Sequence, residues 1–422
     1  MTPLTERYLL AAQQAHINAL QQLPDSCALV SVVCELIHQL QRERGISNIF
    51  LASASALFAS QREQQLQHSL QAAQQLHAVL NFPQQQLAAG SRLFSKIALA
   101  LQGMDQLATL RKQIATQQIT PLQATAAFSR LIAVWLAVVL ELADLACDAS
   151  ISLSLVALFN LLQAKEYAGQ ERAWGAMGLA SGRLDAELAQ RLALLQHAQQ
   201  DSADTFLQFA SAGHCQQWHT LQNSAGGAQL QQLRQLIQQL AGTDHSVPAI
   251  SDIWYQLATE RIDAMHQLQG AMLVALQQLA TAGLRVARQQ LRNQQHQLSS
   301  LADLPQDAGF GVLFDPAMPG LYGASSERVS NASNFTAPNR AFYQLLSEQA
   351  QQISQIQTEL SDARQAVERQ KRIDRAKLLL MQHKQFSEEQ AYRQLQHSAM
   401  QRQCRIADIA EAVIQALCAE PT

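Results

Sequence analysis

The sequence is poor in the residues that interrupt helices or favour sheets. Aromatic residues make up only 5% of its 422 residues, and its 17 glycines and 10 prolines are sparse over the first 300 positions. Leu, Ala and Gln dominate instead, a composition that favours helices over sheets. We therefore expect an all-α protein. A chain of this length exceeds what one hydrophobic core usually organises, so at least two folded units and a linker are expected.

The chain also lacks paired cysteines and long apolar runs. Its six cysteines show no CxxC pair or tandem metal spacing. The N-terminus does not resemble a signal peptide. The most apolar stretch, Leu131 to Leu140, is much shorter than the ~20 residues that span a bilayer. We expect a cytoplasmic protein in a reducing compartment, without membrane contact.

No arrangement of residues suited to catalysis or metal binding is found. His214, Cys215 and His219 lie close together, but no second pair at zinc spacing follows. The segment Gly309 to Gly311 has neither a strand before it nor a suitable helix after it, so it does not indicate a nucleotide loop. No Ser/His/Asp or Cys/His arrangement stands out. We expect no enzyme activity, no metal and no cofactor.

Charge is distributed unevenly along the chain. The net charge is −3, but residues 364–405 contain ten Lys or Arg against four acids, a local balance of +6 that leaves −9 for the remainder. A basic tail on an acidic body is typical of proteins that bind a polyanion, because neutralising phosphates releases counterions. A solvated charged helix has the same composition, so motifs must decide between the two.

Residues 25–297 show repeated amphipathic helices with a period of 3.6 residues. Some of the expected helices are long, such as Ser26 to Ser60 and Ala124 to Ala146, which suits bundles that share long helices. We assign residues 1–300 to one helical domain and the Pro-, Gly- and Ser-rich residues 301–340 to a linker. The clearest breaks between helices are expected at Asn81 to Pro83, Thr120-Pro121, Asp148 to Ser150, Ser224 to Gly227 and Thr243 to Pro248.

After the linker, apolar residues from Ile353 to Val367 follow the alternating spacing of three and four that paired helices require. This seam predicts a coiled-coil helix over residues 341–372, and with it a homodimer. Gln349 and Gln370 fall at core positions, so packing of the seam against the helical domain remains the alternative. Residues 373–422 then hold two short helical patterns, which predict a small three-helix module together with the end of the long helix.

Three arginines occupy positions where apolar residues are expected. The buried face of the first long helix continues from Leu40 to Arg44. Arg172 and Lys165 share a face with leucines of their own helix, so two cations point inward there. Arg234 is flanked by apolar residues on its face. All three arginine stems are therefore expected to be at least partly buried.

Buried cations need a partner of opposite charge, because an unpaired one costs several kcal/mol. Glu43, Glu166 and Glu171 are candidate partners within the protein. A bound anion is the other solution, and three arginines on separate helices favour it. Arginine keeps its charge when desolvated, and its planar fork matches the in-plane oxygens of nitrate. Nitrite or acetate would fit almost as well.

The segments Glu43-Arg44-Gly45 and Lys165 to Ala173 carry a resemblance to a known family. Over roughly residues 26–295 the chain resembles the nitrate- and nitrite-sensing domain of bacterial regulators and receptors. This resemblance implies two packed four-helix bundles and nitrate or nitrite as the effector. It also implies that Arg44, Arg172 and Arg234 contact the ligand.

The basic tail carries a second resemblance. Its Arg375 to Lys377, Glu388 to Leu395, Ala399-Met400 and Ile409-Ala410 segments resemble an ANTAR domain, the antitermination RNA-binding module of response regulators. The expected RNA-binding face combines an aromatic ring that stacks on an unpaired base with basic residues that hold phosphates. A core or rim position is equally open for that aromatic residue. The residues of this face are Lys377, Tyr392, Arg393, Arg402 and Arg405.

Together the two resemblances predict a nitrate- or nitrite-responsive positive regulator. It is expected to bind hairpin loops in a leader mRNA and to prevent transcription termination, acting on the transcribing RNA polymerase complex indirectly. Without ligand the helical domain would mask the basic face, and the anion would release it. The alternative function is an anion-sensing interaction protein whose coiled coil and tail dock a protein partner.

Overall fold

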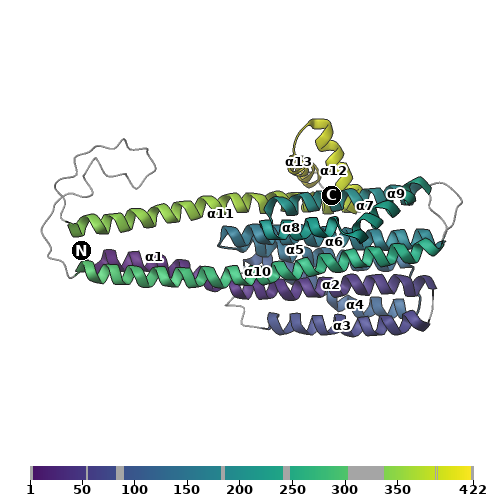
Figure 1. Ribbon diagram of the computed structural model, residues 1–422, viewed down its shortest axis with the longest axis horizontal. Coiled ribbons are helices and arrows are strands. Elements are labelled where there is room, and N and C mark those ends of the chain that lie inside the picture. Colours follow the sequence, from purple (N-terminus) through teal and green to yellow (C-terminus); the bar gives the residue numbers. More distant parts are fainter. Residues whose placement is uncertain are drawn as a thin grey trace.

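The structure, a computed structural model, describes residues 3–53, 56–81, 90–181, 186–240, 248–302, 337–384, 386 and 388–419, and over these ranges it contains helices and no strand. The prediction of an all-α fold is confirmed. Figure 1 shows the arrangement of the helices. They are α1 (Pro3–Gln21), α2 (Leu23–Ser53), α3 (Ala56–Leu80), α4 (Ser91–Ala115), α5 (Pro121–Leu145), α6 (Ala149–Ser181), α7 (Ala186–Phe209), α8 (Ala212–Gln222), α9 (Ala225–Leu240), α10 (Pro248–Ala302), α11 (Ala337–Lys384), α12 (Glu388–Arg402) and α13 (Ile406–Ala419).

Local capping sets several of the helix starts. Thr120 forms a capping box with Gln123: its hydroxyl accepts from the Gln123 backbone N–H at 3.2 Å, and the Gln123 side chain accepts from the Thr120 backbone N–H at 3.0 Å. Pro121 follows at the first helical position, where its missing N–H has no consequence. The Asp148 carboxylate accepts from the Ile151 backbone N–H at the start of α6. The sequence predicted the breaks between helices at both places, Thr120-Pro121 and Asp148 to Ser150.

The expectation of one continuous helix from Ser26 to Ser60 is wrong. α2 ends at Ser53, α3 begins at Ala56, and the two helices pack against each other. Folding back lets α3 bury Leu76 and Ala72 in the main core, whereas a straight continuation would carry these side chains away from it. Apolar periodicity persists across this reversal, so it does not reveal the break.

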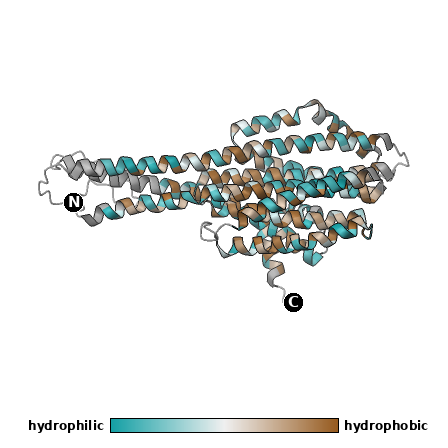
Figure 2. Cartoon of the chain, turned by 90° about the horizontal axis from the view of Figure 1, so that it is seen from below, coloured by the Kyte–Doolittle hydropathy of each residue, from teal (hydrophilic) through white to brown (hydrophobic). Residues whose placement is uncertain are grey.

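Two groups of helices share one core. α2 to α5 pack together, while α6 and α7 pack with α10, and α8 and α9 pack against α10. α2 and α5 contact α6, and α2 contacts α10, so the two groups are joined through these helices. Val33, Trp135 and Phe159 are buried in the common core. Figure 2 shows hydrophobic residues concentrated where the helices pack and more hydrophilic residues along the extension to the left.

α11 joins this helical body, residues 3–302, to the C-terminal module. Part of α11 lies on α5 and α6, and Val367 belongs to the main core. This end of the predicted seam therefore packs on the body, as the alternative interpretation expected. Ile356 is 38% exposed, and the homodimer stays a prediction. The linker expected at 301–340 lies almost entirely outside the described residues.

The end of α11, α12 and α13 form the expected small three-helix module around a separate core. Ala376, Ala391, Leu395 and Ala410 are buried in it, and the alanines allow the helices to approach closely. In Figure 1, α12 and α13 lie on the upper side of the body, where α12 contacts α7 and α13 packs on α11.

Two stretches are long and apolar enough to cross a membrane, Leu10–Ala52 and Pro121–Leu145. Their most apolar windows are 56% and 61% buried inside the protein. Core helices of water-soluble proteins pass the same test, so these stretches are weak evidence for insertion into a bilayer.

Candidate functional site

Arg44, on α2, is buried in the middle of the helical body. Its side chain is 1% exposed and forms an ion pair with Glu166 of α6, and its Nη1 donates to Ser129 Oγ at 2.8 Å. Gln41 also donates to Glu166, at 2.9 Å. The Nη2 atom of Arg44 is buried without a hydrogen-bond partner among the described residues. Arg44 is therefore neutralised on one side and still has donor capacity on the other.

Arg172, on α6, is buried beside it without a carboxylate. Its Nη1 donates to Thr259 Oγ1 at 2.9 Å, and its guanidinium lies 4.8 Å from the centre of the Tyr255 ring. No ion pair of Arg172 is found in the part of the chain that the structure describes, and Nε is buried without a partner there. Burial lowers the pKa of Arg172 and the charges of Arg44 and Arg42 lower it further, while Tyr255 and Asp263 oppose this. The surroundings thus leave a positive charge incompletely compensated.

Arg172 lines a small cavity between α2, α6 and α10, whereas Arg44 does not line it and lies against Gly169 of its wall. The cavity has a volume of about 40 Å³, and on this measure a single water needs about 10–15 Å³. It can therefore hold a few waters or one small anion. The lining residues are His38, Gln41, Arg42, Lys165, Gly169, Arg172, Thr259, Ile262 and Asp263.

Gly169, which lines this cavity, makes room for the Arg44 side chain. A Cβ atom at position 169 would lie 2.7 Å from Arg44 Nη2, a distance that real side chains do not tolerate. The glycine of the KEYAGQERA segment, residues 165–173, therefore makes room for the arginine of the Glu43-Arg44-Gly45 segment. This contact brings the two segments together.

Sequence analysis missed two other features of the cavity wall. Lys165 was recognised as pointing inward but was not selected as a binding residue, although it is completely buried. His38 is 3% exposed, and its ring stacks on that of His266 with centroids 3.6 Å apart. A usable signal exists, because Cys34, His38, Gln41 and Gly45 share one helical face.

Arg234, the third predicted ligand position, lies in a different environment. Its Nε and Nη2 donate to the two carboxylate oxygens of Glu171 at 2.8 and 2.6 Å, and Nη2 also reaches Gln199 Oε1 at 3.1 Å. Arg234 does not line the small cavity. Glu166 and Glu171 are thus internal partners as expected, while Glu43 pairs instead with Arg111, at 2.7 and 2.8 Å.

The five predicted RNA-binding residues divide into two sets. Arg393, Arg402 and Arg405 are exposed. Lys377 is buried, pairs with Asp374 at 2.9 Å and donates to the Tyr167 hydroxyl of α6 at 3.3 Å. Tyr392 is partly buried and hydrogen-bonds to Asp201 of α7. Burial raises the pKa of the Tyr392 hydroxyl, and the negative charge of Asp201 raises it further.

Comparison with known proteins assigns the helical body and the C-terminal module each to a known family. Residues 35–277 match the family described as nitrate and nitrite sensing. The chain belongs to the nitrate and nitrite sensing family. Residues 361–414 match the ANTAR domain, so a sensing domain and an ANTAR domain are combined in one protein, as in a nitrate-responsive regulator of antitermination.

Two similar proteins share this whole arrangement. The nitrate regulatory protein of Klebsiella oxytoca is 29% identical over 421 residues, covering 98% of this chain and 95% of that protein. The solved structure of the NasR transcription antiterminator is 27% identical, with a TM-score of 0.59 over 98% of this chain and 97% of the other. These families and relatives are regulatory rather than enzymatic.

Within this member of the nitrate and nitrite sensing family, the ANTAR domain contacts the sensing domain at three places. Lys371 of α11 contacts Asp144 at 2.7 Å and Glu141 at 3.1 Å, both on α5. Lys377 contacts Tyr167 of α6, and further along the chain α12 lies against α7. The docked arrangement covers Lys377 and Tyr392 and leaves the remaining basic residues outside.

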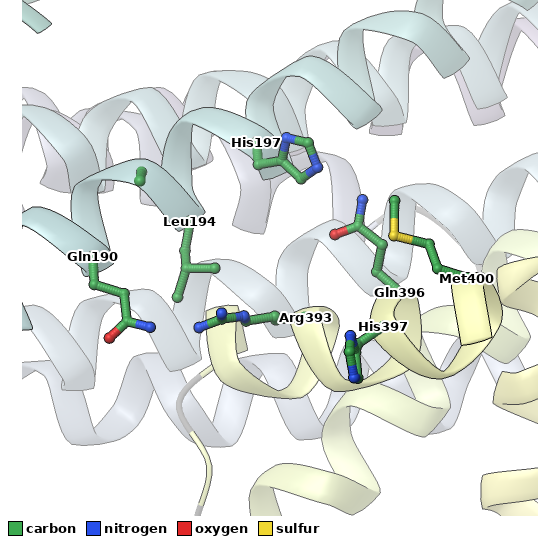
Figure 3. Close-up of a pocket in the computed structure, with 8 residues that line it drawn as sticks. Gln190, Leu194, His197, Arg393, Gln396, His397 and Met400 are labelled. Carbon is green, nitrogen blue, oxygen red and sulfur yellow. The ribbon is translucent and has the colours of Figure 1, made fainter. Parts of the chain in front are cut away.

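A groove of about 370 Å³ runs between the sensing-domain helix α7 and the ANTAR helix α12. Figure 3 shows Arg393 from α12 extending toward Leu194 and Gln190 of α7. His197 of α7 faces Gln396 and Met400 across the same groove (Figure 3). Arg393 is therefore exposed but confined on one side by the sensing domain.

Proposed function

We propose that the sensing domain binds nitrate or nitrite in the cavity between α2, α6 and α10, and that binding releases the ANTAR domain. The released domain binds hairpin loops in a leader mRNA and prevents transcription termination. Its action on the transcribing RNA polymerase complex is indirect, through the RNA. The protein works in the cytoplasm, without a cofactor other than its effector anion.

The observation that carries this proposal is the unbalanced charge of Arg172. A buried cation without an ion pair is costly. The Arg172 guanidinium donates to a hydroxyl and lies against an aromatic ring, and the Asp263 carboxylate on the same cavity forms no ion pair with it among the described residues. An anion in the adjoining cavity would supply the missing negative charge. The unpartnered Nε of Arg172 is a further donor of the kind that planar oxyanions accept. The unpartnered Nη2 of Arg44 lies against Gly169 of the cavity wall, so a contact between Arg44 and the anion stays a prediction.

The size of the cavity restricts the anion. A volume of about 40 Å³ suits an ion of three or four heavy atoms, which includes nitrite and nitrate. Large organic anions do not fit without rearrangement of α2 or α10. Family membership selects nitrate and nitrite among the small anions that the charge alone would accept.

Arg234 as a third ligand position stays a prediction. In this structure its guanidinium makes a two-bond ion pair with Glu171, so an anion would have to draw it away from that carboxylate. Glu171 directly precedes Arg172 on α6, which gives Arg234 an indirect route to the cavity through the position of that helix.

Masking of the ANTAR domain follows from its contacts with the sensing domain. Tyr392 cannot stack on an RNA base while it is hydrogen-bonded to Asp201 in the interface. Lys377 cannot hold a phosphate while it is buried between Asp374 and Tyr167. The structure therefore has the features of an inhibited state in which two of the five predicted RNA contacts are occupied.

α6 is the element through which the anion would act on the ANTAR domain. It carries Arg172 at the cavity and Tyr167 at the contact with Lys377. A ligand that prefers the released state by ~100-fold shifts the balance by ~2.7 kcal/mol. This shift is sufficient when the two states differ by a similar amount in the absence of ligand.

The test measures binding of the full-length protein to leader RNA with and without nitrate. We expect nitrate to raise RNA affinity, and Arg172→Ala to abolish the effect while Arg288→Ala, at an exposed position of α10, preserves it. RNA binding that ignores nitrate, or an unchanged response in Arg172→Ala, would contradict the proposal. Nitrate-dependent capture of a protein partner, with no RNA binding, would instead support the interaction-protein function.

A further inference from the structure

Lys165 is a second buried cation in the wall of the cavity. It is 0% exposed and sits on α6, two turns before Arg172. Its ammonium donates to the side-chain oxygen of Gln269, a neutral amide on α10. Within the described part of the chain no carboxylate forms an ion pair with it, unlike Arg44, Arg111 and Arg234.

Ionisable groups from all three helices that form the cavity surround this ammonium. Glu35 of α2, Glu166 of α6 and Asp263 of α10 act on it from a distance and favour its charged form. Burial opposes them and is the largest effect. Arg42, Arg172 and the carboxylate of Asp263 line the same cavity, so together with Lys165 three cations share it with one carboxylate. The local balance is therefore short of negative charge at the position of Lys165.

The two histidines beside Lys165 do not supply a charge of their own. His38 and His266 stack with their rings within 5° of parallel. Burial and the nearby Lys165 lower the pKa of both rings, so they stay neutral near pH 7. Burial raises the pKa of the Cys34 thiol to about 12. Of these four groups, Lys165 alone changes charge between pH 7 and pH 10.

We propose that Lys165 is a ligand of the bound anion, and that the anion and one proton bind to the sensing domain together. This inference rests on the proposed function, because it concerns the same cavity. The anion supplies a negative charge that no protein carboxylate provides to Lys165 through an ion pair among the described residues, and the ammonium supplies a hydrogen-bond donor to the anion. Arginine could not couple binding to a proton, since it does not lose its charge in proteins.

Burial lowers the pKa of Lys165 from 10.5 to about 8. Below pH 8 the ammonium is already charged and the anion binds without taking up a proton. Above pH 8 the free protein has lost this proton, and the anion must restore it. Affinity is therefore expected to be constant up to about pH 8 and then to fall by up to about tenfold per pH unit, as one linked proton requires.

Calorimetric titration of the full-length protein with sodium nitrate from pH 6.5 to pH 9.5 tests this. Titration at pH 9 in two buffers of different ionisation enthalpy measures the proton taken up. Three variants accompany the natural chain. Lys165→Arg keeps the charge at every pH, Lys165→Met removes it, and Lys112→Met changes an exposed lysine of α4 as a matched control.

We expect Lys165→Arg to bind nitrate with an affinity that does not fall above pH 8. Lys165→Met should bind at least about tenfold more weakly at pH 7 and also without pH dependence, and Lys112→Met should match the natural chain. Equal affinity of Lys165→Met and the natural chain at pH 7 would overturn the proposal. The same holds if Lys165→Arg shows the natural decline above pH 8, a comparison that stands even if Lys165→Met fails to fold.

Failure of the proposed function gives a different result. In that case the natural chain binds no nitrate at pH 7, where Lys165 is charged. If Arg172→Ala abolishes nitrate binding while Lys165→Met retains it, the anion site stands and the role of Lys165 does not.

Discussion

The guanidinium of Arg172 lies directly against Gly45, the residue that follows Arg44 on α2. A Cβ atom at position 45 would lie 2.5 Å from Arg172 Nη2. Together with the contact between Gly169 and Arg44, this means that each arginine occupies the space opened by a glycine of the opposite helix. The two glycines therefore serve the placement of the cations rather than a turn, since both lie inside helices.

Gly45→Ala should weaken nitrate binding without weakening the fold. Alanine improves helix propensity by ~1 kcal/mol, but its methyl group must displace Arg172 from the cavity. We expect at least about a tenfold loss of nitrate affinity, equivalent to ~1.4 kcal/mol. Gly283→Ala is the matched control, because nothing lies within 4 Å of its added Cβ. Calorimetry and thermal unfolding measure both effects, and unchanged affinity in Gly45→Ala would contradict the assignment of the site.

Arg234→Ala should destabilise the sensing domain. The substitution leaves the buried carboxylate of Glu171 without its cation, which typically costs about 3–5 kcal/mol. The double variant Arg234→Met with Glu171→Gln should recover most of this loss in a denaturant titration. Its nitrate affinity then decides the role of Arg234: a stable double variant that no longer binds nitrate makes Arg234 a ligand, and one that binds normally makes the ion pair structural.

Asp201→Ala should release part of the ANTAR domain without nitrate. Loss of the hydrogen bond from Tyr392 removes about 1–3 kcal/mol from the docked state, which corresponds to a rise of about 5- to 160-fold in leader-RNA affinity in the absence of ligand. Asp105→Ala, at an exposed position of α4, is the control. Gel-shift titration without nitrate provides the measurement. RNA affinity that stays at the unliganded level would show that this contact does not hold the domain closed.

Charge reversal at Arg402 or Arg405 should abolish binding to leader RNA and leave nitrate binding unchanged. Both residues are exposed on the ANTAR domain, far from the anion cavity. Each lost phosphate contact also lowers the salt slope of RNA binding by about one. Loss of nitrate affinity in the same variants would indicate general misfolding, and retained RNA binding would remove these residues from the predicted face.

Lys165→Met should stabilise the protein without ligand at neutral pH. The pKa of Lys165 is about 8 when folded and 10.5 otherwise, so between these values the unfolded chain binds more protons and stability rises with pH. The destabilisation is complete below pH 8 and amounts to ~3 kcal/mol. The difference in unfolding free energy between Lys165→Met and the natural chain should therefore shrink from pH 7 to pH 10. A constant difference would show that Lys165 does not titrate in this window.

Features fixed by local chemistry could be predicted from the sequence. The capped starts of α5 and α6 follow from Thr120 and Asp148 because their partners are three residues away. The inward direction of Arg44 and Arg172 follows from helical periodicity. The reversal after Ser53 could not be predicted, because the apolar pattern of α2 and α3 is the same on either side of it.

Partners across helices could not be predicted in the same way. Arg44 and Arg234 each form an ion pair with a glutamate, whereas Arg172 donates to the Thr259 hydroxyl instead. All three arginines nevertheless lie on the apolar face of their own helix. Only the packing of α6 against α2 and α10 decides which cation remains uncompensated. The two interpretations of Tyr392 are likewise compatible with one sequence, since its burial depends on whether the ANTAR domain is docked.

The attachments of Lys371 to α5, of Lys377 to α6 and of Tyr392 to α7 are separate, yet they hold the same small domain. When one of them opens, the others keep the detached surface close to its partner, at an effective concentration far above that of any free molecule. Brief local openings therefore reclose before a transcript can be captured. RNA binding consequently requires all the attachments to open together, so binding without nitrate is rare and the response to nitrate is steep.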